Sequence, residues 1–140
     1  MKKSGLTQNQ LRDAYIKEVR SLLELAVPVW SSGITLEQTV QIERVQKAAL
    51  AAIVGPSVIN YDHTLKKLNL DRLSTRREQI CKKFIRKNMK SDKPLLKSSK
   101  KVHNTRSSPN CVDEINCRTQ SFFTSSVPYL ARLYNRNLKK

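Results

Sequence analysis

Residues 72–90 read RLSTRREQICKKFIRKNMK, and this stretch decides the fold of the chain. Its apolar residues recur at spacings of three and four, which places them on one arc of a helix. Basic residues project from the opposite arc. The stretch therefore predicts an amphipathic helix with one core face and one positive ridge. The apolar arc consists of Leu73, Ile80, Cys81, Phe84 and Ile85.

Two segments upstream carry the same helical period. Apolar residues from Thr7 to Ala26 predict a helix that ends before Pro28, because proline cannot donate to a preceding turn. Residues 30–33 are then expected to form a turn. Thr35 and Gln38 make a capping box, which predicts the start of a second helix. The apolar stripe of this second helix is expected to hold Ile42, Val45, Ala49, Ala52 and Ile53.

The other segments are shorter or less regular. Asp62 is expected to cap a short helix that carries Leu65 and Leu68. Beyond residue 90 large apolar groups are few, so ordering the chain there would cost about 1–2 kcal/mol per residue in backbone entropy with little burial to offset it. Near the end of the chain, Pro128 is expected to start a short helix within an aromatic cluster.

Together these patterns predict an all-α protein. No run alternates apolar and polar residues over the length of a strand, so no sheet is expected. We predict a small bundle of three to four helices in residues 1–90 and a basic disordered linker in residues 91–117. Residues 118–140 are expected to form an aromatic C-terminal segment with a short helix.

The charge of the chain is large and unevenly distributed. Its 27 lysines and arginines against 11 acidic residues give a formal net charge of +16, which is typical of proteins that bind nucleic acid. Residues 1–54 carry seven basic and five acidic side chains, whereas residues 81–106 carry ten basic and one acidic. The positive surface is therefore expected in the middle of the chain.

Three spaced motifs point to an origin. Glu24–Trp30 reads ELAVPVW, Glu43–Lys47 reads ERVQK, and Arg76–Glu78 reads RRE. In this order they resemble the segment just downstream of the polymerase palm in jockey-like non-LTR retrotransposon reverse transcriptases. The tail Ser125–Asn135, which reads SSVPYLARLYN, resembles that family's closing motif, so the resemblance covers nearly the whole chain with one gap.

The resemblance implies a thumb-like domain in residues 1–90 that contacts a template–primer duplex by its shape and not by its base sequence. Leu25, Ala48 and Tyr134 depart from the family's usual residues. The family's Tyr-x-Asp-Asp hairpin, whose converging aspartates hold the catalytic magnesium ions, is missing. The aspartates that are present stand isolated: Asp13, Asp62, Asp71, Asp92 and Asp113.

We therefore expect a non-catalytic fragment of an RNA-directed DNA polymerase from a transposable element, with no cofactor and no metal. The positive ridge is interpreted as its nucleic-acid-binding site, because a row of lysines and arginines gains affinity from counterion release whatever the base sequence. The alternative interpretation of the ridge is a solvated helix face. The ridge consists of Arg76, Lys82, Lys83, Arg86, Lys87 and Lys90.

The expected partners are RNA, DNA or an RNA–DNA duplex, bound without sequence preference, and also the upstream reverse transcriptase palm. The alternative function is a helical protein-interaction module, or an inert domesticated remnant that does not bind nucleic acid. No apolar window approaches the ~20 residues of a membrane span, so no membrane partner is expected. An intracellular location, nuclear or cytoplasmic, fits best.

Two further groups of residues are potential sites. His103, Cys111 and Cys117 lack the closely spaced ligand pairs of a zinc site, so unpaired thiols in a reducing compartment are expected. Tyr15 and Trp30 lie on apolar arcs. They are expected to be packing residues, with base stacking as the less favoured interpretation.

Overall fold

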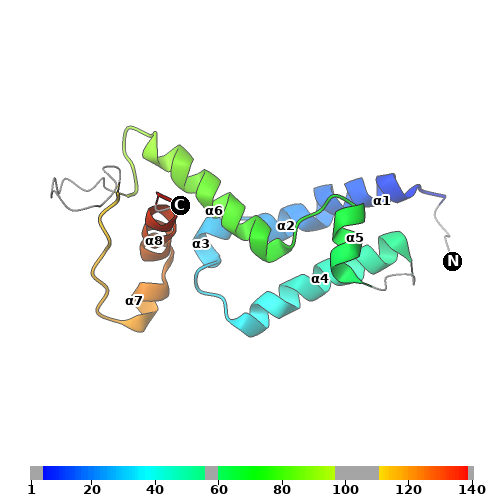
Figure 1. Cartoon of the computed structure of the whole chain (residues 1–140), viewed down its shortest axis with the longest axis horizontal. Coiled ribbons are helices and arrows are strands. Elements are labelled where there is room, and N and C mark those ends of the chain that lie inside the picture. Colours follow the sequence, from blue (N-terminus) through cyan, green and yellow to red (C-terminus); the bar gives the residue numbers. More distant parts are fainter. Residues whose placement is uncertain (1–4, 56–59, 97–110, 139–140) are drawn as a thin grey trace. The chain divides into compact units, whose positions relative to one another are not determined.

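The computed structural model describes residues 5–55, 60–96 and 111–138. Helices make up most of these residues, and no strand is found among them (Figure 1). The predicted all-α fold is thereby confirmed. In chain order the helical elements are α1 (Gln8–Ala14), η1 (Tyr15–Arg20), α2 (Ser21–Glu24), α3 (Val27–Trp30), α4 (Leu36–Val54), α5 (Tyr61–Lys67), α6 (Leu73–Met89), α7 (Gln120–Thr124) and α8 (Ser126–Leu138).

The first helical run comprises α1, η1 and α2 without interruption. Thr7 begins it with a capping box, and its middle section η1 is a π-helix, a wider form that is frequent at functional sites. The run ends at Glu24, two residues earlier than predicted, and Ala26 adopts a φ of 51°, which breaks the helix. Helix α3 follows. Pro28 fits into its first turn, where backbone N–H groups have no partner within the helix, so the predicted turn is confined to residues 31–33.

Of the caps predicted for α4 and α5, only the cap of α4 is found in the structure. Thr35 caps α4 through the predicted capping box, and Gly55 ends the helix with a φ of 89°, which glycine adopts readily. Asp62 does not cap α5 as predicted. The cap is Asn60, whose Oδ1 accepts from the backbone N–H of Asp62 at 3.0 Å, while the Asp62 carboxylate binds Arg72.

The buried stripe of α4 also differs from the predicted one. Val45 is 44% exposed, and Ala52 is exposed as well. A polar residue, Gln46, is buried instead, because its Nε2 donates to the backbone carbonyl of Asp71 at 3.0 Å. A hydrophobic pattern alone assigns such a residue to solvent. The buried residues of α4 are Gln46, Leu50 and Ile53.

The chain divides into two compact units, and each has its own core. The first unit comprises residues 1–26 and 34–77, and the second comprises residues 27–33 and 78–140. The division thus falls within α6, whereas the sequence predicted divisions after residues 90 and 117. The core of the first unit consists of Tyr15, Leu50, Ile53, Leu65, Leu68 and Leu70.

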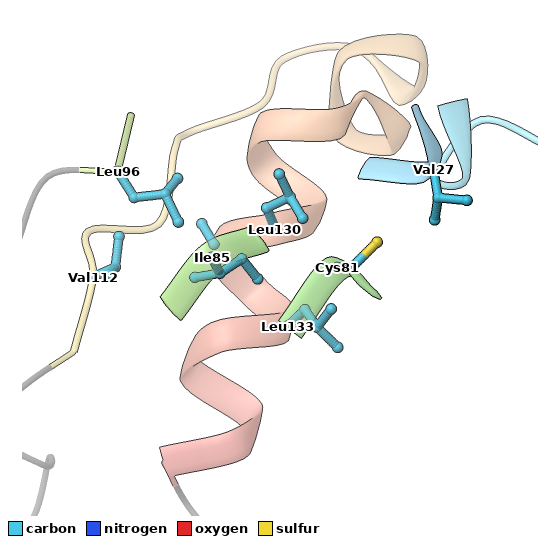
Figure 2. Packing of buried hydrophobic residues seen from close by; sticks show 8 residues of the cluster. Val27, Cys81, Ile85, Leu96, Val112, Leu130 and Leu133 are labelled. Atoms are coloured by element: carbon cyan, nitrogen blue, oxygen red, sulfur yellow. The ribbon is translucent and has the colours of Figure 1, made fainter. Parts of the chain in front are cut away.

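The core of the second unit joins α3, α6 and α8 with two stretches outside the helices (Figure 2). Leu96 and Val112 come from the predicted disordered linker, yet each is only 3% exposed. The linker prediction is therefore wrong at these two positions, and residues 97–110 lie outside the described part of the chain. The core consists of Val27, Cys81, Ile85, Leu96, Val112, Leu130, Ala131 and Leu133.

A side chain of α8 holds Val112 in this core. Asn135 Oδ1 accepts from the Val112 N–H at 2.9 Å, and Asn135 Nδ2 donates to the Val112 carbonyl at 2.9 Å. One amide thus satisfies both backbone groups of a buried residue, which is what permits the extended segment to enter the core. Helix α8 begins at Ser126, two residues before the predicted start at Pro128, and α7 precedes it where the sequence predicted no helix.

Candidate nucleic-acid interface

The predicted site follows α6, but its cations do not share one environment. Arg76 belongs to the first unit, and its side chain is 30% exposed. Its Nε donates to Glu24 Oε1 at 2.9 Å, and its Nη2 donates to Glu24 Oε2 at 3.3 Å. The prediction that Arg76 belongs to an open positive ridge is therefore wrong, because a carboxylate at the end of α2 neutralises it.

Arg20 shares the same carboxylate. Its Nε donates to Glu24 Oε1 at 2.8 Å, and its side chain is only 10% exposed. Arg20, Glu24 and Arg76 thus form a triad in which one carboxylate lies between two guanidinium groups. Sequence reasoning gave Arg20 no role, although its position four residues before Glu24 is the spacing at which opposite charges meet on a helix.

Lys82 of the predicted site is also paired. Its Nζ lies 2.7 Å from Glu78 Oε1, one helical turn earlier on α6. Both side chains reach solvent, so the pair contributes at most about 1 kcal/mol and opens readily. Lys82 therefore presents a weakened positive charge.

The other four predicted cations are exposed. Within the described ranges, none of the four side chains has an ion-pair or hydrogen-bond partner. Their spacing puts them on the side of the helix opposite Cys81 and Ile85 of the core, in a row about 10 Å long. Phe84, which the sequence placed on the core arc, is 39% exposed. We call this row the basic face of α6, and it consists of Lys83, Arg86, Lys87 and, one residue beyond the helix, Lys90.

The first turn of α6 is fixed by a carboxylate from α4. Glu43 Oε1 accepts from the backbone N–H of Ser74 at 2.8 Å, and Glu43 Oε2 accepts from the Tyr61 hydroxyl at 2.8 Å. Burial raises the pKa of Tyr61, and the hydrogen bond to Glu43 raises it further. Burial also raises the pKa of Tyr15 to about 12, against the opposing effect of Arg20.

Two more arginines near this turn are held within the first unit. Arg72 Nη2 lies 2.7 Å from Asp62 Oδ1, and this hydrogen bond raises the pKa of Arg72. Arg77 is 8% exposed, and its Nη2 donates to Thr39 Oγ1 at 3.4 Å. Contacts within the protein therefore occupy the arginines at the start of α6.

The remaining candidate residues lie apart from the basic face. Tyr15 is buried and Trp30 packs against the core of the second unit, so both are packing residues, as predicted. Cys111 and Cys117 are partly buried, and His103 lies outside the described residues. Where the chain is described, no three His, Cys, Asp or Glu residues lie close enough together to hold a metal ion. No helix in the same ranges is long and apolar enough to cross a membrane.

The second unit contains an arginine–aromatic pair that sequence reasoning missed. The Arg132 guanidinium lies 3.6 Å from the centroid of the Phe123 ring, and its Nη2 donates to the Phe123 carbonyl at 2.6 Å. Phe123 is nevertheless 43% exposed. The two residues belong to different helices, α7 and α8, so no local spacing in the sequence indicates their contact.

Comparison with known proteins adds no further assignment. No family model, curated protein or solved structure matches the chain. The exposure and charge of the basic face of α6 are therefore the observations from which a function is argued.

Proposed function

We propose that this chain is a non-catalytic segment of a retrotransposon-derived RNA-directed DNA polymerase, and that it contacts the template–primer through the basic face of α6. One observation carries the proposal: four exposed cations stand in a row without a carboxylate partner among the described residues. Such a row attracts phosphates and gains affinity by releasing counterions. The partner is RNA, DNA or an RNA–DNA duplex, bound without sequence preference.

The form of the basic face suits contact with a nucleic-acid backbone. Duplex DNA carries one phosphate charge per about 1.7 Å of its axis, so a row about 10 Å long lies along roughly six charges. No acidic residue interrupts residues 83–90. The planar guanidinium of Arg86 can bind two phosphate oxygens at once, while lysine ammonium groups act as adaptable point charges. Contacts of this kind position a nucleic acid but do not read its bases.

The proposal includes no polymerase turnover by the chain itself. The sequence lacks the Tyr-x-Asp-Asp hairpin, and carboxylates near α6 already serve the fold. Glu24 binds two arginines, Glu43 binds Tyr61 and a backbone N–H, and Asp62 binds Arg72. We expect template–primer extension with magnesium only when a palm segment is added to the chain. Nucleotide incorporation by the chain alone would contradict the proposal.

Duplex binding by the full chain and two matched variants tests the basic face directly. The first variant replaces its four cations with glutamine. The second variant replaces four exposed cations of the first unit with glutamine, so that both variants lose the same charge. Fluorescence anisotropy with a labelled RNA–DNA duplex measures affinity, and circular dichroism checks helicity. The cations replaced in the second variant are Arg44, Lys47, Lys66 and Lys67.

The two variants should differ sharply. For the unmodified chain, four phosphate contacts predict that affinity falls about 100-fold between about 50 and 200 mM salt. The basic-face variant should lose most of this affinity and most of its salt dependence, whereas the first-unit variant should retain both. Equal losses in the two variants would show that net charge alone drives binding, and the proposal would fail.

A different observation favours a second function, that of a helical protein-interaction module. Val19 and Leu22 lie in the first helical run and Leu25 directly follows it; all three are exposed, with Leu22 72% exposed. Exposed apolar surface of this kind marks protein contact sites. Under this alternative the upstream palm is the partner. Leu22→Ser would then weaken capture of a palm segment, and the basic-face variant would bind that segment as the unmodified chain does.

A further inference from the structure

The first unit contains an open polar cavity of about 370 Å³ that no function described so far uses. It lies beside the Arg–Glu–Arg triad, where η1 and α2 meet the segment that precedes α6 and the start of α6 itself. Its wall contains one apolar side chain, and the rest is polar or charged. The lining residues are Ile16, Arg20, Ser21, Glu24, Asn69, Asp71 and Arg76.

Arg20 is the residue that indicates which kind of ligand this cavity could bind. Nine-tenths of its side chain is buried, yet the only hydrogen bond it makes among the described residues runs from its Nε to Glu24. Arg20 lines the cavity, and its two η nitrogens have no protein acceptor among the described residues. Neither η nitrogen is among the buried side-chain atoms that lack a partner in the described part of the chain, so water reaches both of them. A ligand with acceptor oxygens can replace this water at a guanidinium.

The acceptor has to come from outside the triad. Glu24 Oε1 already accepts from Arg20 at 2.8 Å and from Arg76 at 2.9 Å, and Glu24 Oε2 accepts from Arg76 at 3.3 Å. Both oxygens of the Glu24 carboxylate thus already accept hydrogen bonds from the two arginines. The ligand that fits is rich in acceptor oxygens and can meet the planar fork of a guanidinium, which a phosphate group does.

We propose that this cavity binds a phosphate group, with the η nitrogens of Arg20 as its principal donors. The proposal stands on residues of the first unit, and it does not depend on the basic face of α6, which belongs to the second unit. The phosphate comes either from a nucleic-acid strand or from a small phosphate ion or ester. Both sources present the same tetrahedral set of oxygens.

Asp71 sets the strength of this site. Asp71 lines the cavity together with Glu24, so two acidic residues balance the two arginines. Formal charge at the site is therefore neutral, and affinity arises from directed hydrogen bonds more than from long-range attraction. Removal of the Asp71 charge should accordingly strengthen phosphate binding.

The first test is a titration of the full chain with inorganic phosphate at constant ionic strength, followed by NMR of the arginine Nε–Hε signals. Sodium chloride is the matched titrant. We expect the Arg20 signal to shift with phosphate in a saturable manner and not with chloride. Arg20→Gln should weaken binding about tenfold or more, whereas Arg44→Gln, which removes the same charge from an exposed position of α4, should leave it unchanged.

The second test does not depend on a variant that removes a buried group. Asp71→Asn should tighten phosphate binding severalfold, and Glu37→Gln, an exposed change on α4, should have no effect. The absence of a phosphate-specific Arg20 shift, equal losses in Arg20→Gln and Arg44→Gln, or no tightening in Asp71→Asn would each overturn the proposal.

A third titration identifies the source of the phosphate. A short single-stranded oligonucleotide that shifts the same Arg20 signal, and whose effect inorganic phosphate competes away, assigns the site to a nucleic-acid strand. An oligonucleotide that leaves the signal in place assigns it to a small phosphate. Replacement of the four cations of the basic face with glutamine should leave phosphate binding at Arg20 unchanged. The phosphate site and the proposed nucleic-acid contact of α6 can therefore be refuted independently of each other.

Discussion

The two halves of α6 carry the same kind of side chain and use it differently. In the half that belongs to the first unit, Arg76 binds Glu24 and Arg77 is buried beside Thr39. In the half that belongs to the second unit, Lys83, Arg86 and Lys87 are exposed without an ion-pair partner in the described ranges. The environment of a cation on this helix thus depends on whether neighbouring elements bring a polar partner, as Glu24 does for Arg76 and Thr39 does for Arg77.

The distribution of acidic residues explains the difference. The first unit supplies Glu24 from α2, Glu43 from α4 and Asp62 from α5, and each contacts a group on α6 or directly before it. In the second unit the core partners of α6 are apolar side chains of α3 and α8. The first half of the helix is therefore held in part by carboxylates. The second half is held mainly by its apolar face, with two polar contacts in addition, one between Cys81 and Ser31 and one from the Leu95 N–H to Asn88.

The largest effect that tests this contrast is expected from Glu24→Gln. The change leaves two guanidinium groups, one of them nine-tenths buried, without their shared carboxylate. Breaking a buried ion pair on one side costs up to about 3–5 kcal/mol, and the partial exposure of Arg76 lowers the expected loss to about 2–3 kcal/mol. Urea unfolding followed by circular dichroism measures this loss.

Lys87→Gln on the basic face is the matched control. Its side chain is exposed and has no ion-pair partner in the described part of the chain, so its removal should change the free energy of unfolding by at most about 0.5 kcal/mol. If Glu24→Gln unfolded at the same urea concentration as Lys87→Gln, the triad would contribute nothing and the two halves of α6 would be equivalent.

The sequence predicts the elements whose signals are local. The bounds of α6 follow from a strong apolar period between residues 72 and 90, and the start of α4 follows from Thr35 and Gln38, which contact each other within one turn. The exposure of Lys83 and Arg86 is predictable for the same reason, since both lie opposite the apolar arc of their own helix. A single helix suffices for each of these inferences.

Features that depend on residues far away in the chain cannot be predicted from the sequence pattern. The position of Arg76 on its helix predicts a side chain in solvent. In the structure it binds the carboxylate of a residue 52 positions away, a contact that the helix pattern cannot predict. Gln46 is buried because a carbonyl 25 residues away accepts from it. Val112 enters the core because Asn135 satisfies its backbone, and no composition rule for a basic, serine-rich segment can indicate that.

Alkaline pH should weaken the first unit through its buried Tyr15. The folded-state pKa of Tyr15 is raised from 10.0 to about 12, so the fold favours the neutral phenol. This contribution is fully present below pH 10 and is lost as the pH rises from 10 to 12. Thermal unfolding across this range should show a loss of about 1–2 kcal/mol that is clearly smaller in Tyr15→Phe. Identical pH profiles for the two proteins would exclude Tyr15 as the cause.

A smaller difference between the two halves of α6 is expected in the salt dependence of duplex binding. Arg86→Gln removes one phosphate contact, so the slope of log affinity for duplex DNA against log salt should become shallower by about 0.9. Arg76→Gln removes the same charge from a residue already paired with Glu24, so the slope should stay the same. Anisotropy titrations at several salt concentrations provide both slopes. Equal changes for the two variants would mean that Arg76 is as available to phosphate as Arg86.

The smallest effect is expected from Asp62→Asn, which breaks the exposed pair with Arg72. The two side chains approach to 2.7 Å, but each is 54% exposed, so water and salt screen their attraction. The loss should be small in dilute buffer, and the urea midpoints of variant and unmodified chain should converge at about 1 M salt. The deficit of Glu24→Gln should persist there, because the side chain of one of its partners, Arg20, is nine-tenths buried. A salt-resistant deficit in Asp62→Asn would instead mean that the Arg72 pair, directly before α6, holds the start of this helix as the triad does at Arg76.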